Sequence, residues 1–212
     1  MELEFNVVLG SVILLALAVF LTVKYVYNPF KSTLKKAAAG NPEAQYRLGY
    51  LYYQGKYVAQ DYRQAFHWFQ TAAQNGYFKA HTALAGLYNA GHGCQKSNAD
   101  TFKHYTLAAE QGDFEARVNL AVCHLKGIGT PVNETLGFET MKAAADDKSP
   151  IAQLLTGDMY ERGCGVEKNE TLALKYYILA GNQGEPRAKE RIKKLKSKKE
   201  LSQSHAGKFY PR

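Results

Sequence analysis

The side chains that could catalyse a reaction or bind a metal are scattered along this chain. It has six histidines: His67, His81, His92, His104, His124 and His205. No two of them have metal-ligand spacing on one helix face together with a third ligand. No nucleophile stands with a base in a recognisable arrangement, and the acidic pairs Asp146–Asp147 and Glu167/Glu170 are expected in solvated loops or caps. The pattern predicts a protein that is not an enzyme and has no metal site and no cofactor.

These residues belong to a chain that repeats itself every 36 residues without an insertion or deletion. The same small residues return at fixed offsets. The repeats start at Ala44, Ala80, Ala116, Ala152 and Ala188, and glycine follows eleven residues later at Gly55, Gly91, Gly127 and Gly163. A fixed period in this range is typical of a stacked repeat architecture, which mostly presents a surface to a partner.

Each repeat is predicted to form two helices. In the first repeat, one buried helix face is formed by Ala44, Leu48, Leu51 and Tyr52. The glycine eleven residues after the start suits a helix end, because it accepts the left-handed conformation at low steric cost. The second helix is expected to begin at good N-cap residues: Asp61, Ser97, Asn133 and Asn169. Glycine also recurs 13 and 32 residues after the repeat start. Tyr57 replaces the first of these glycines in the first repeat, and Lys148 replaces the second in the third repeat.

The stretch AQYRLGYLYYQGKYVAQDYRQAFHWFQTAAQNG resembles a Sel1-like repeat, a 36-residue relative of the tetratricopeptide repeat. The resemblance covers about residues 36–197, with full copies at 44–79, 80–115, 116–151 and 152–187. It implies an all-α fold, a right-handed α/α superhelical solenoid with capping helices. It also implies a protein-binding adaptor.

The ends of the solenoid are expected to be capped, because a terminal repeat must shield an apolar face. Residues 28–43 are predicted to form a juxtamembrane segment and a half-repeat that starts near Pro29. At the other end, residues 188–199 continue the apolar spacing among charged residues and are predicted to form a capping helix. Residues 200–212 are predicted to be a basic, disordered tail.

The N-terminus is predicted to be a membrane anchor. Residues 5–23 carry no charge, and as a helix they would span roughly 28 Å, close to the thickness of a bilayer. The start Met-Glu-Leu-Glu lacks the basic region of a cleaved signal peptide. Residues 1–27 are therefore expected to anchor a single-pass membrane protein, typically of a bacterial inner membrane. Lysines after the span place the N-terminus outside and the repeats in the cytoplasm.

The cysteines agree with a reducing compartment. The chain has three, and no repeat holds a pair. Cys123 is expected to be a small buried hydrophobic side chain, since leucine stands at its place in earlier repeats. Cys94 and Cys164 lie in linkers two repeats apart, which is too far for a disulfide.

The net charge of +8 is concentrated at the C-terminus. Residues 44–186 carry 13 basic and 14 acidic side chains, whereas residues 187–212 carry ten and two. The neutral repeats argue against a solenoid that binds nucleic acid, which would carry a basic stripe. The tail has three interpretations: a solvated cap, contact with anionic lipid, or RNA binding.

The partner-binding surface is inferred by analogy with tetratricopeptide geometry, in which unpacked side chains of the first helices line a concave groove. The predicted groove residues are Tyr46, Tyr50, Tyr53, Val118, Val122, Leu125, Ile151 and Leu154. Tyrosine is a favoured anchor at interfaces, and the aliphatic residues are more apolar than a solvent face needs. The alternative is that these residues pack against each other or against the chain's own tail.

The leading functional hypothesis is a membrane-anchored adaptor that holds a protein partner in the groove. Two alternatives stay open. One is an exported or envelope-facing protein in cell-envelope or host interaction. The other is an auxiliary subunit of a membrane complex, although residues 5–23 contain no Gly-x-x-x-Gly packing motif.

Overall fold

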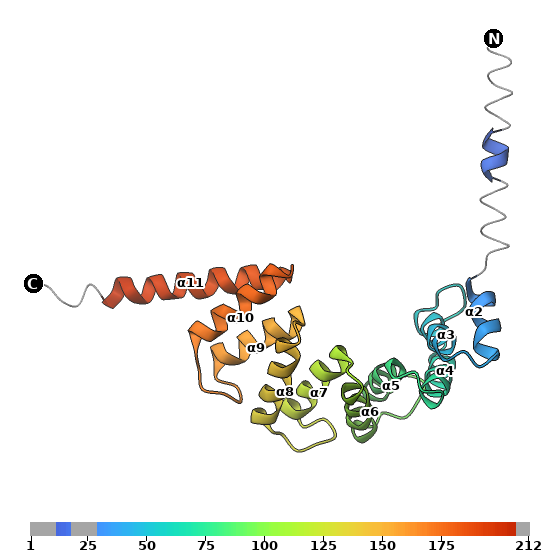
Figure 1. Cartoon of the computed structure of the whole chain (residues 1–212), viewed down its shortest axis with the longest axis horizontal. Helices are drawn as coiled ribbons and strands as arrows, with labels where there is room; N and C mark the ends of the chain where they lie inside the picture. The colour runs from blue at the N-terminus through green and yellow to red at the C-terminus, as the bar shows by residue number, and fades with distance from the viewer. Residues whose placement is uncertain (1–11, 18–28, 207–212) are drawn as a thin grey trace, which may run out of the picture. The chain divides into compact units, whose positions relative to one another are not determined.

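The computed structural model describes residues 12–17 and 29–206, and every regular element in these ranges is a helix (Figure 1). The helices are short and similar in length, apart from the last. After a short helix at residues 12–17, they are α2 (Pro29–Ala38), α3 (Pro42–Gln54), α4 (Tyr62–Gln74), α5 (Lys79–Ala90), α6 (Asn98–Glu110), α7 (Phe114–Lys126), α8 (Glu134–Asp146), α9 (Pro150–Arg162), α10 (Glu170–Asn182) and α11 (Pro186–Ala206). The fold is an all-α solenoid of helix pairs.

Local capping explains where the repeat helices begin and end. The predicted N-caps of the second helices are confirmed, since each side chain accepts a hydrogen bond from a backbone N–H of the first turn: Asp61, Ser97, Asn133 and Asn169. Three first helices end at a glycine with left-handed backbone: Gly55, Gly127 and Gly163.

Tyr57 and Lys148, which stand where other repeats have glycine, adopt a strained left-handed backbone conformation. Tyr57 (φ 66°) and Lys148 (φ 67°) are the non-glycine residues with positive φ among the described residues. The equivalent glycines elsewhere also have positive φ: Gly93, Gly129 and Gly165 for Tyr57, and Gly40, Gly76, Gly112 and Gly184 for Lys148. The turn geometry is therefore kept even where the sequence does not supply glycine, at a steric cost.

Small residues allow neighbouring segments to approach closely. A Cβ on Gly157 would lie 2.6 Å from the ring of Tyr177, so only glycine lets α9 and α10 pack at this distance. A Cβ on Gly165 would collide with the backbone carbonyl of Glu134, at the start of α8. Gly93 and Gly129 make the same close approach to the carbonyls of Tyr62 and Asn98, so this glycine lets each linker pack against the preceding second helix.

The chain folds into two compact units. Unit 1 comprises Met1–Ala80 with Gly91–Gln95, and unit 2 comprises His81–Ala90 with Lys96–Arg212. In unit 1, Ala37 of α2 is buried with Ala44 and Leu48 of α3, and Phe30 and Trp68 pack against them. The half-repeat helix α2 therefore shields the apolar side of the first repeat.

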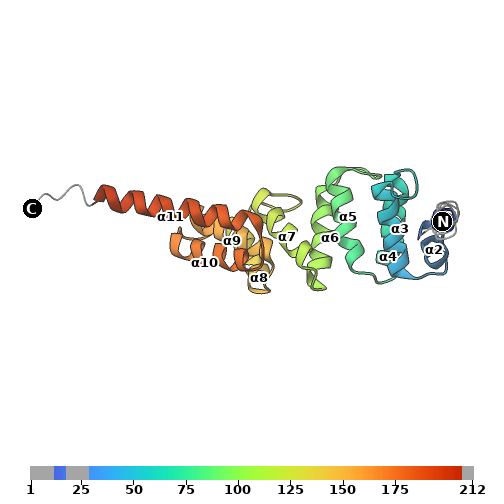
Figure 2. The ribbon, with the colours of Figure 1, turned by 90° about the horizontal axis from the view of Figure 1, so that it is seen from above.

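Unit 2 has a larger core, which runs through α7 to α11. The fully buried side chains include Met141, Leu154 and Tyr177, and α11 adds Ala188 and Leu195. Figure 2 shows α11 continuing well past α10. The helix ends at Ala206 rather than at residue 199, so the prediction that the tail is disordered from residue 200 is wrong up to residue 206. No glycine or proline interrupts these residues before Gly207.

The predicted transmembrane helix is not supported. Of residues 5–23, the structure describes only 12–17, which are helical; the others lie outside the described residues. In the described part of the chain, no helix is both long and apolar enough to cross a bilayer. This finding contradicts the predicted localisation as a single-pass membrane protein, and the predicted sidedness falls with it.

Candidate partner-binding surface

Three of the predicted groove residues form one continuous surface on α3. Tyr46, Tyr50 and Tyr53 have the spacing of a single helix face, and we call them the tyrosine face. The ring centroids of Tyr46 and Tyr50 are 5.0 Å apart, and those of Tyr50 and Tyr53 are 6.3 Å apart, both with edge-to-face geometry. Tyr50 is 37% exposed and Tyr53 is 36% exposed, while Tyr46 is half-buried.

Further aromatic side chains of unit 1 hold the tyrosine face in place. The Tyr46 ring lies 4.9 Å from that of Tyr77, and the Tyr50 ring lies 5.3 Å from that of the buried Phe69. At the other end, the Tyr53 ring lies 5.5 Å from Tyr62, which stacks on His92 at 4.3 Å. The partly exposed rings are therefore held in place by their neighbours.

The aliphatic members of the predicted groove are packed rather than exposed. Val118, Val122 and Leu125 of α7 and Ile151 of α9 are half-buried and lie against the core of unit 2. Leu154 is 1% exposed and belongs to that core.

The orientation of Leu125 has a clear physical cause. A Cβ on Gly137 would lie 2.6 Å from a methyl carbon of Leu125, so the glycine of α8 makes the space that this leucine fills. In unit 2, these side chains therefore contribute to packing against the core.

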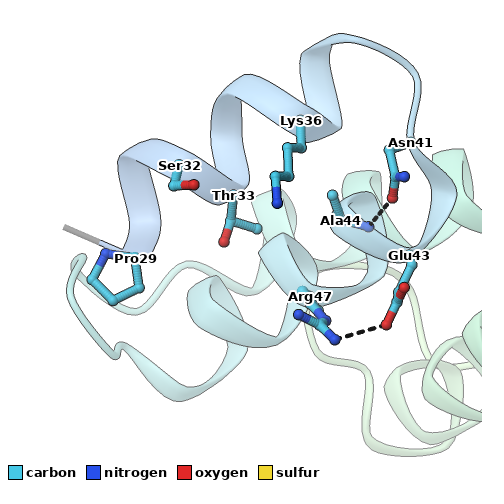
Figure 3. A pocket seen from close by; sticks show the side chains of 8 residues that line it. All are labelled: Pro29, Ser32, Thr33, Lys36, Asn41, Glu43, Ala44 and Arg47. Atoms are coloured by element: carbon cyan, nitrogen blue, oxygen red, sulfur yellow. Dashed lines mark hydrogen bonds and ion pairs between the residues drawn. The ribbon is translucent and has the colours of Figure 1, made fainter. Parts of the chain in front are cut away.

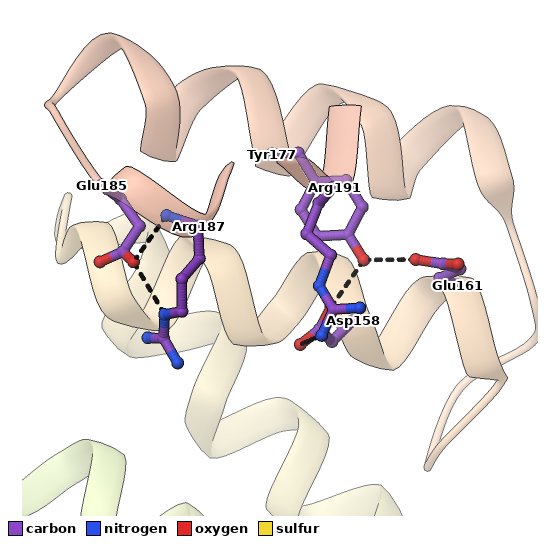
Figure 4. A network of polar contacts seen from close by, with 6 residues as sticks. All are labelled: Asp158, Glu161, Tyr177, Glu185, Arg187 and Arg191. Atoms are coloured by element: carbon purple, nitrogen blue, oxygen red, sulfur yellow. Dashed lines mark hydrogen bonds and ion pairs between the residues drawn. The ribbon is translucent and has the colours of Figure 1, made fainter. Parts of the chain in front are cut away.

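Two acidic residues on α9 are also committed to the fold (Figure 4). The hydroxyl of the buried Tyr177 lies 2.7 Å from Asp158 Oδ1 and 2.6 Å from Glu161 Oε2. Arg191 of α11 pairs with Asp158, with 3.1 Å between Nε and Oδ1. Burial, followed by the hydrogen bonds to the two carboxylates, raises the pKa of Tyr177. The network fastens α11 to the last repeat.

The sequence analysis missed one close pair of titratable residues. Nδ1 of His81 in α5 lies 2.9 Å from Nδ1 of His104 in α6, and the ring planes differ by 26°. One ring must donate an N–H and the other must accept it, so at least one ring is neutral. Burial lowers the pKa of both rings, that of His104 to about 4, with further lowering by His81 and Lys103 against an opposing effect of Asp100.

A Sel1 repeat family model matches residues 42–77, 79–113, 114–149 and 150–185. The chain belongs to the Sel1 repeat family. The matched segments begin one or two residues before the alanines that mark the repeat starts. Sel1 repeat proteins bind protein partners and are generally non-catalytic adaptors. The comparisons do not support the expected contacts with lipid, and they do not support contact with nucleic acid.

Solved structures show the same fold. The chain is similar to a protective antigen present in uropathogenic Escherichia coli strains, with 33% identity over 74% of this chain and 34% of that chain, and a TM-score of 0.70. A Sel1 repeat protein from Oxalobacter formigenes shares 26% identity over 77% of this chain and 65% of its own, with a TM-score of 0.72. An immunity protein from Pseudomonas aeruginosa is 21% identical over 75% and 59% of the two chains, with a TM-score of 0.53, which shows the fold alone.

The two more similar structures are longer than the matched part. The chain spans 34% of the Escherichia coli protein and 65% of the Oxalobacter formigenes protein. No curated protein matches the chain.

Apart from His205, the histidines and cysteines singled out in the sequence lie within these Sel1 repeats. Within the described residues, no cluster of three or more His, Cys, Asp or Glu side chains could hold a metal. His124 is buried and its ring lies 5.4 Å from Phe102, as expected for a packed ring. Cys123 is buried, and burial raises the pKa of its thiol.

Proposed function

We propose that this chain is a non-catalytic scaffold that binds a protein partner through the tyrosine face of unit 1. The observation that carries the proposal is the combination of order and exposure at Tyr50 and Tyr53. Their rings are held by aromatic neighbours, yet about a third of each residue stays accessible. Such rings supply large apolar contact area at low entropic cost, and the family supplies the class of function.

A crosslinked pull-down from cells tests the proposal. The double variant Tyr50→Glu, Tyr53→Glu replaces the two partly exposed rings with charged side chains and leaves the fully buried core residues unchanged. Capture of a partner should fall at least tenfold, because hot-spot residues contribute about 2 kcal/mol or more.

The control for this experiment is Phe114→Glu, at a 52% exposed aromatic residue of α7. It should capture the partner as the native chain does, and circular dichroism should show native helix content for both variants. Equal capture by the native chain and the double tyrosine variant would contradict the proposed surface.

The likeness to the protective antigen favours a second candidate, an exported protein with a role in host interaction. The thiols discriminate the two candidates, because Cys164 is half-buried and forms no disulfide. Labelling of Cys164 in intact cells by a membrane-impermeant maleimide would support export. Labelling only after lysis would support an intracellular scaffold.

A further inference from the structure

A polar pocket lies between α2 and α3 of unit 1 (Figure 3). Its volume is about 250 Å³, enough for a side chain of a partner. The lining residues are Pro29, Ser32, Thr33, Lys36, Asn41, Glu43, Ala44 and Arg47. Figure 3 shows the ends of Lys36, Thr33 and Arg47 directed towards the same space.

The two cationic side chains of this pocket keep donors that the fold does not use. No carboxylate among the described residues pairs with the Lys36 ammonium. Arg47 donates one N–H to Glu43, at 2.7 Å, which leaves the other N–H groups of its guanidinium available.

The hydroxyl of Thr33 also differs from those of comparable threonines. Thr71, Thr106 and Thr140 each donate to the carbonyl four residues earlier in their helices. Among the described residues, Thr33 has no such bond. Its hydroxyl can therefore donate into the pocket, beside Lys36.

The charged side chains of the pocket favour an anionic ligand. Lys36 and Arg47 bring two positive charges to the pocket and Glu43 brings one negative charge, so the pocket has a net positive charge. Ammonium, guanidinium and hydroxyl donors that converge on one space suit an oxyanion, and guanidinium matches its geometry.

The pocket also adjoins the tyrosine face. Glu43, Arg47 and Tyr50 follow one another at intervals of four and three along α3, and Tyr46 stands between them. Residues three or four apart on a helix are surface neighbours, so the pocket begins one turn before the exposed tyrosine rings. A partner lying on the tyrosine face can reach both.

We propose that this pocket binds an oxyanion-bearing side chain, a carboxylate or a phosphate monoester, of the protein partner that contacts the tyrosine face. The proposal rests on the proposed function for the origin of the ligand, but the pocket can be tested without the partner. It assigns the partner a chemistry: apolar or aromatic anchors, with an acidic or phosphorylated residue about one helical turn away.

The test is an NMR titration of the ¹⁵N-labelled chain with two probes, N-acetyl-glutamate amide and N-acetyl-phosphoserine amide. Sodium chloride at the same ionic strength is the background. Saturable shifts at residues 33, 36 and 47 are expected, and the probe that binds more tightly identifies the oxyanion. Shifts that rise linearly without saturation, or occur equally with chloride alone, would overturn the proposal.

Variants with opposite expected signs sharpen this test. Lys36→Gln should weaken probe binding about fivefold, the loss expected for one exposed ion pair. Glu43→Gln should strengthen it, because it removes the competing carboxylate from Arg47. The matched control is Lys31→Gln, at an exposed lysine of the same helix that does not line the pocket. Equal weakening by the Lys31 and Lys36 variants would show diffuse charge attraction and overturn the proposal.

The outcomes for the pocket and for the proposed function separate cleanly. Probe binding that survives Tyr50→Glu, Tyr53→Glu, while partner capture is unaffected by that variant, would refute the tyrosine face and leave the oxyanion pocket standing. Partner capture that depends on the tyrosines, with no saturable probe binding, would refute the pocket and leave the proposed function standing.

Discussion

The tyrosine face of unit 1 and four of the aliphatic groove residues of unit 2 occupy the same positions of the repeat but have different environments. Tyr46 corresponds to Val118 and Leu154, Tyr50 to Val122, and Tyr53 to Leu125. In unit 1 these positions carry ordered aromatic rings with accessible area, whereas in unit 2 they carry side chains packed on the core. A position in the repeat therefore does not by itself decide whether a residue faces solvent.

Side-chain shape and the opposing helix account for the difference. Leu125 fills the space left by Gly137, and Leu154 is enclosed completely. A tyrosine at these positions is longer and ends in a hydroxyl that favours water or a polar partner. The rings of α3 therefore pack against each other and keep their outer edges accessible. The repeat provides the same backbone in both units, and the side chains decide which unit presents accessible aromatic rings.

Truncation of Leu154 is expected to have the largest effect on stability. If it is core, Leu154→Ala should lower the free energy of unfolding by about 3 kcal/mol, through lost burial and the cavity left behind. Leu136→Ala is the matched control, because Leu136 is a 39% exposed leucine of the same unit and should cost less than about 1 kcal/mol. Urea unfolding followed by circular dichroism measures both. Equal losses would mean that Leu154 is no more committed to the core than a surface leucine.

A second difference between the units concerns the side-chain contact at the position of Gln45 in the repeat. In unit 1, Gln45 accepts a hydrogen bond from Asn75 at 2.8 Å, and in unit 2 Gln153 accepts one from Gln183 at 2.7 Å. These amide contacts link the start of a first helix to the end of the next helix. In the second repeat, the position of Gln45 is taken by His81, which contacts His104 instead.

Acid should therefore weaken unit 2 before unit 1. The folded pKa of His104, about 4, and that of His81 both lie below the ordinary value of 6.5. The unfolded chain thus binds more protons between these values, and stability falls as pH drops from 6.5 towards 4. Solvent screening of these partly exposed rings limits the expected loss to about 1–2 kcal/mol. Within unit 2, the charged groups that act on the pair are Lys103 and Asp100 of α6. The Tyr88 ring of α5 stacks on His104, and Asp113, the N-cap of α7, accepts a hydrogen bond from Thr82.

Hydrogen exchange at pH 7 and pH 5 measures this difference region by region. The amides of α5 and α6 should lose protection at pH 5 after correction for intrinsic rates, whereas those of α3 and α4 should not. The double variant His81→Gln, His104→Gln should remove most of the pH effect, while His67→Gln, at a half-buried histidine of α4, should leave it unchanged. Undiminished pH dependence in the double variant would rule out the histidine pair as its source.

The sequence predicted what is decided locally and missed what depends on neighbours. The N-caps and glycine turns were predictable because each is settled within a few residues, as at Asp61 and Gly55. The burial of Leu154 was not, because it depends on what the adjacent helix offers. The histidine pair had a weak signal, since His81 replaces the glutamine that stands at this position in the first and fourth repeats. Residues 201–205 are mostly polar and were predicted to be disordered, but they contain no glycine or proline, and α11 continues through them to Ala206.

The smallest expected effect concerns the two strained turns, one in each unit. Lys148→Gly should stabilise the chain by about 0.5–1 kcal/mol, since glycine removes the left-handed strain but loses more entropy on folding. The equivalent glycines 76, 112 and 184 have open space at the Cβ position, so the effect at this site is one of backbone conformation alone. Tyr57→Gly should gain less, because it also removes the contact between the Tyr57 ring and the Lys56 ammonium, 5.4 Å from the ring centroid. Thermal unfolding of both variants beside the native chain checks the order. A larger gain for Tyr57→Gly than for Lys148→Gly would mean that the contact between the Tyr57 ring and Lys56 adds no stability to this turn.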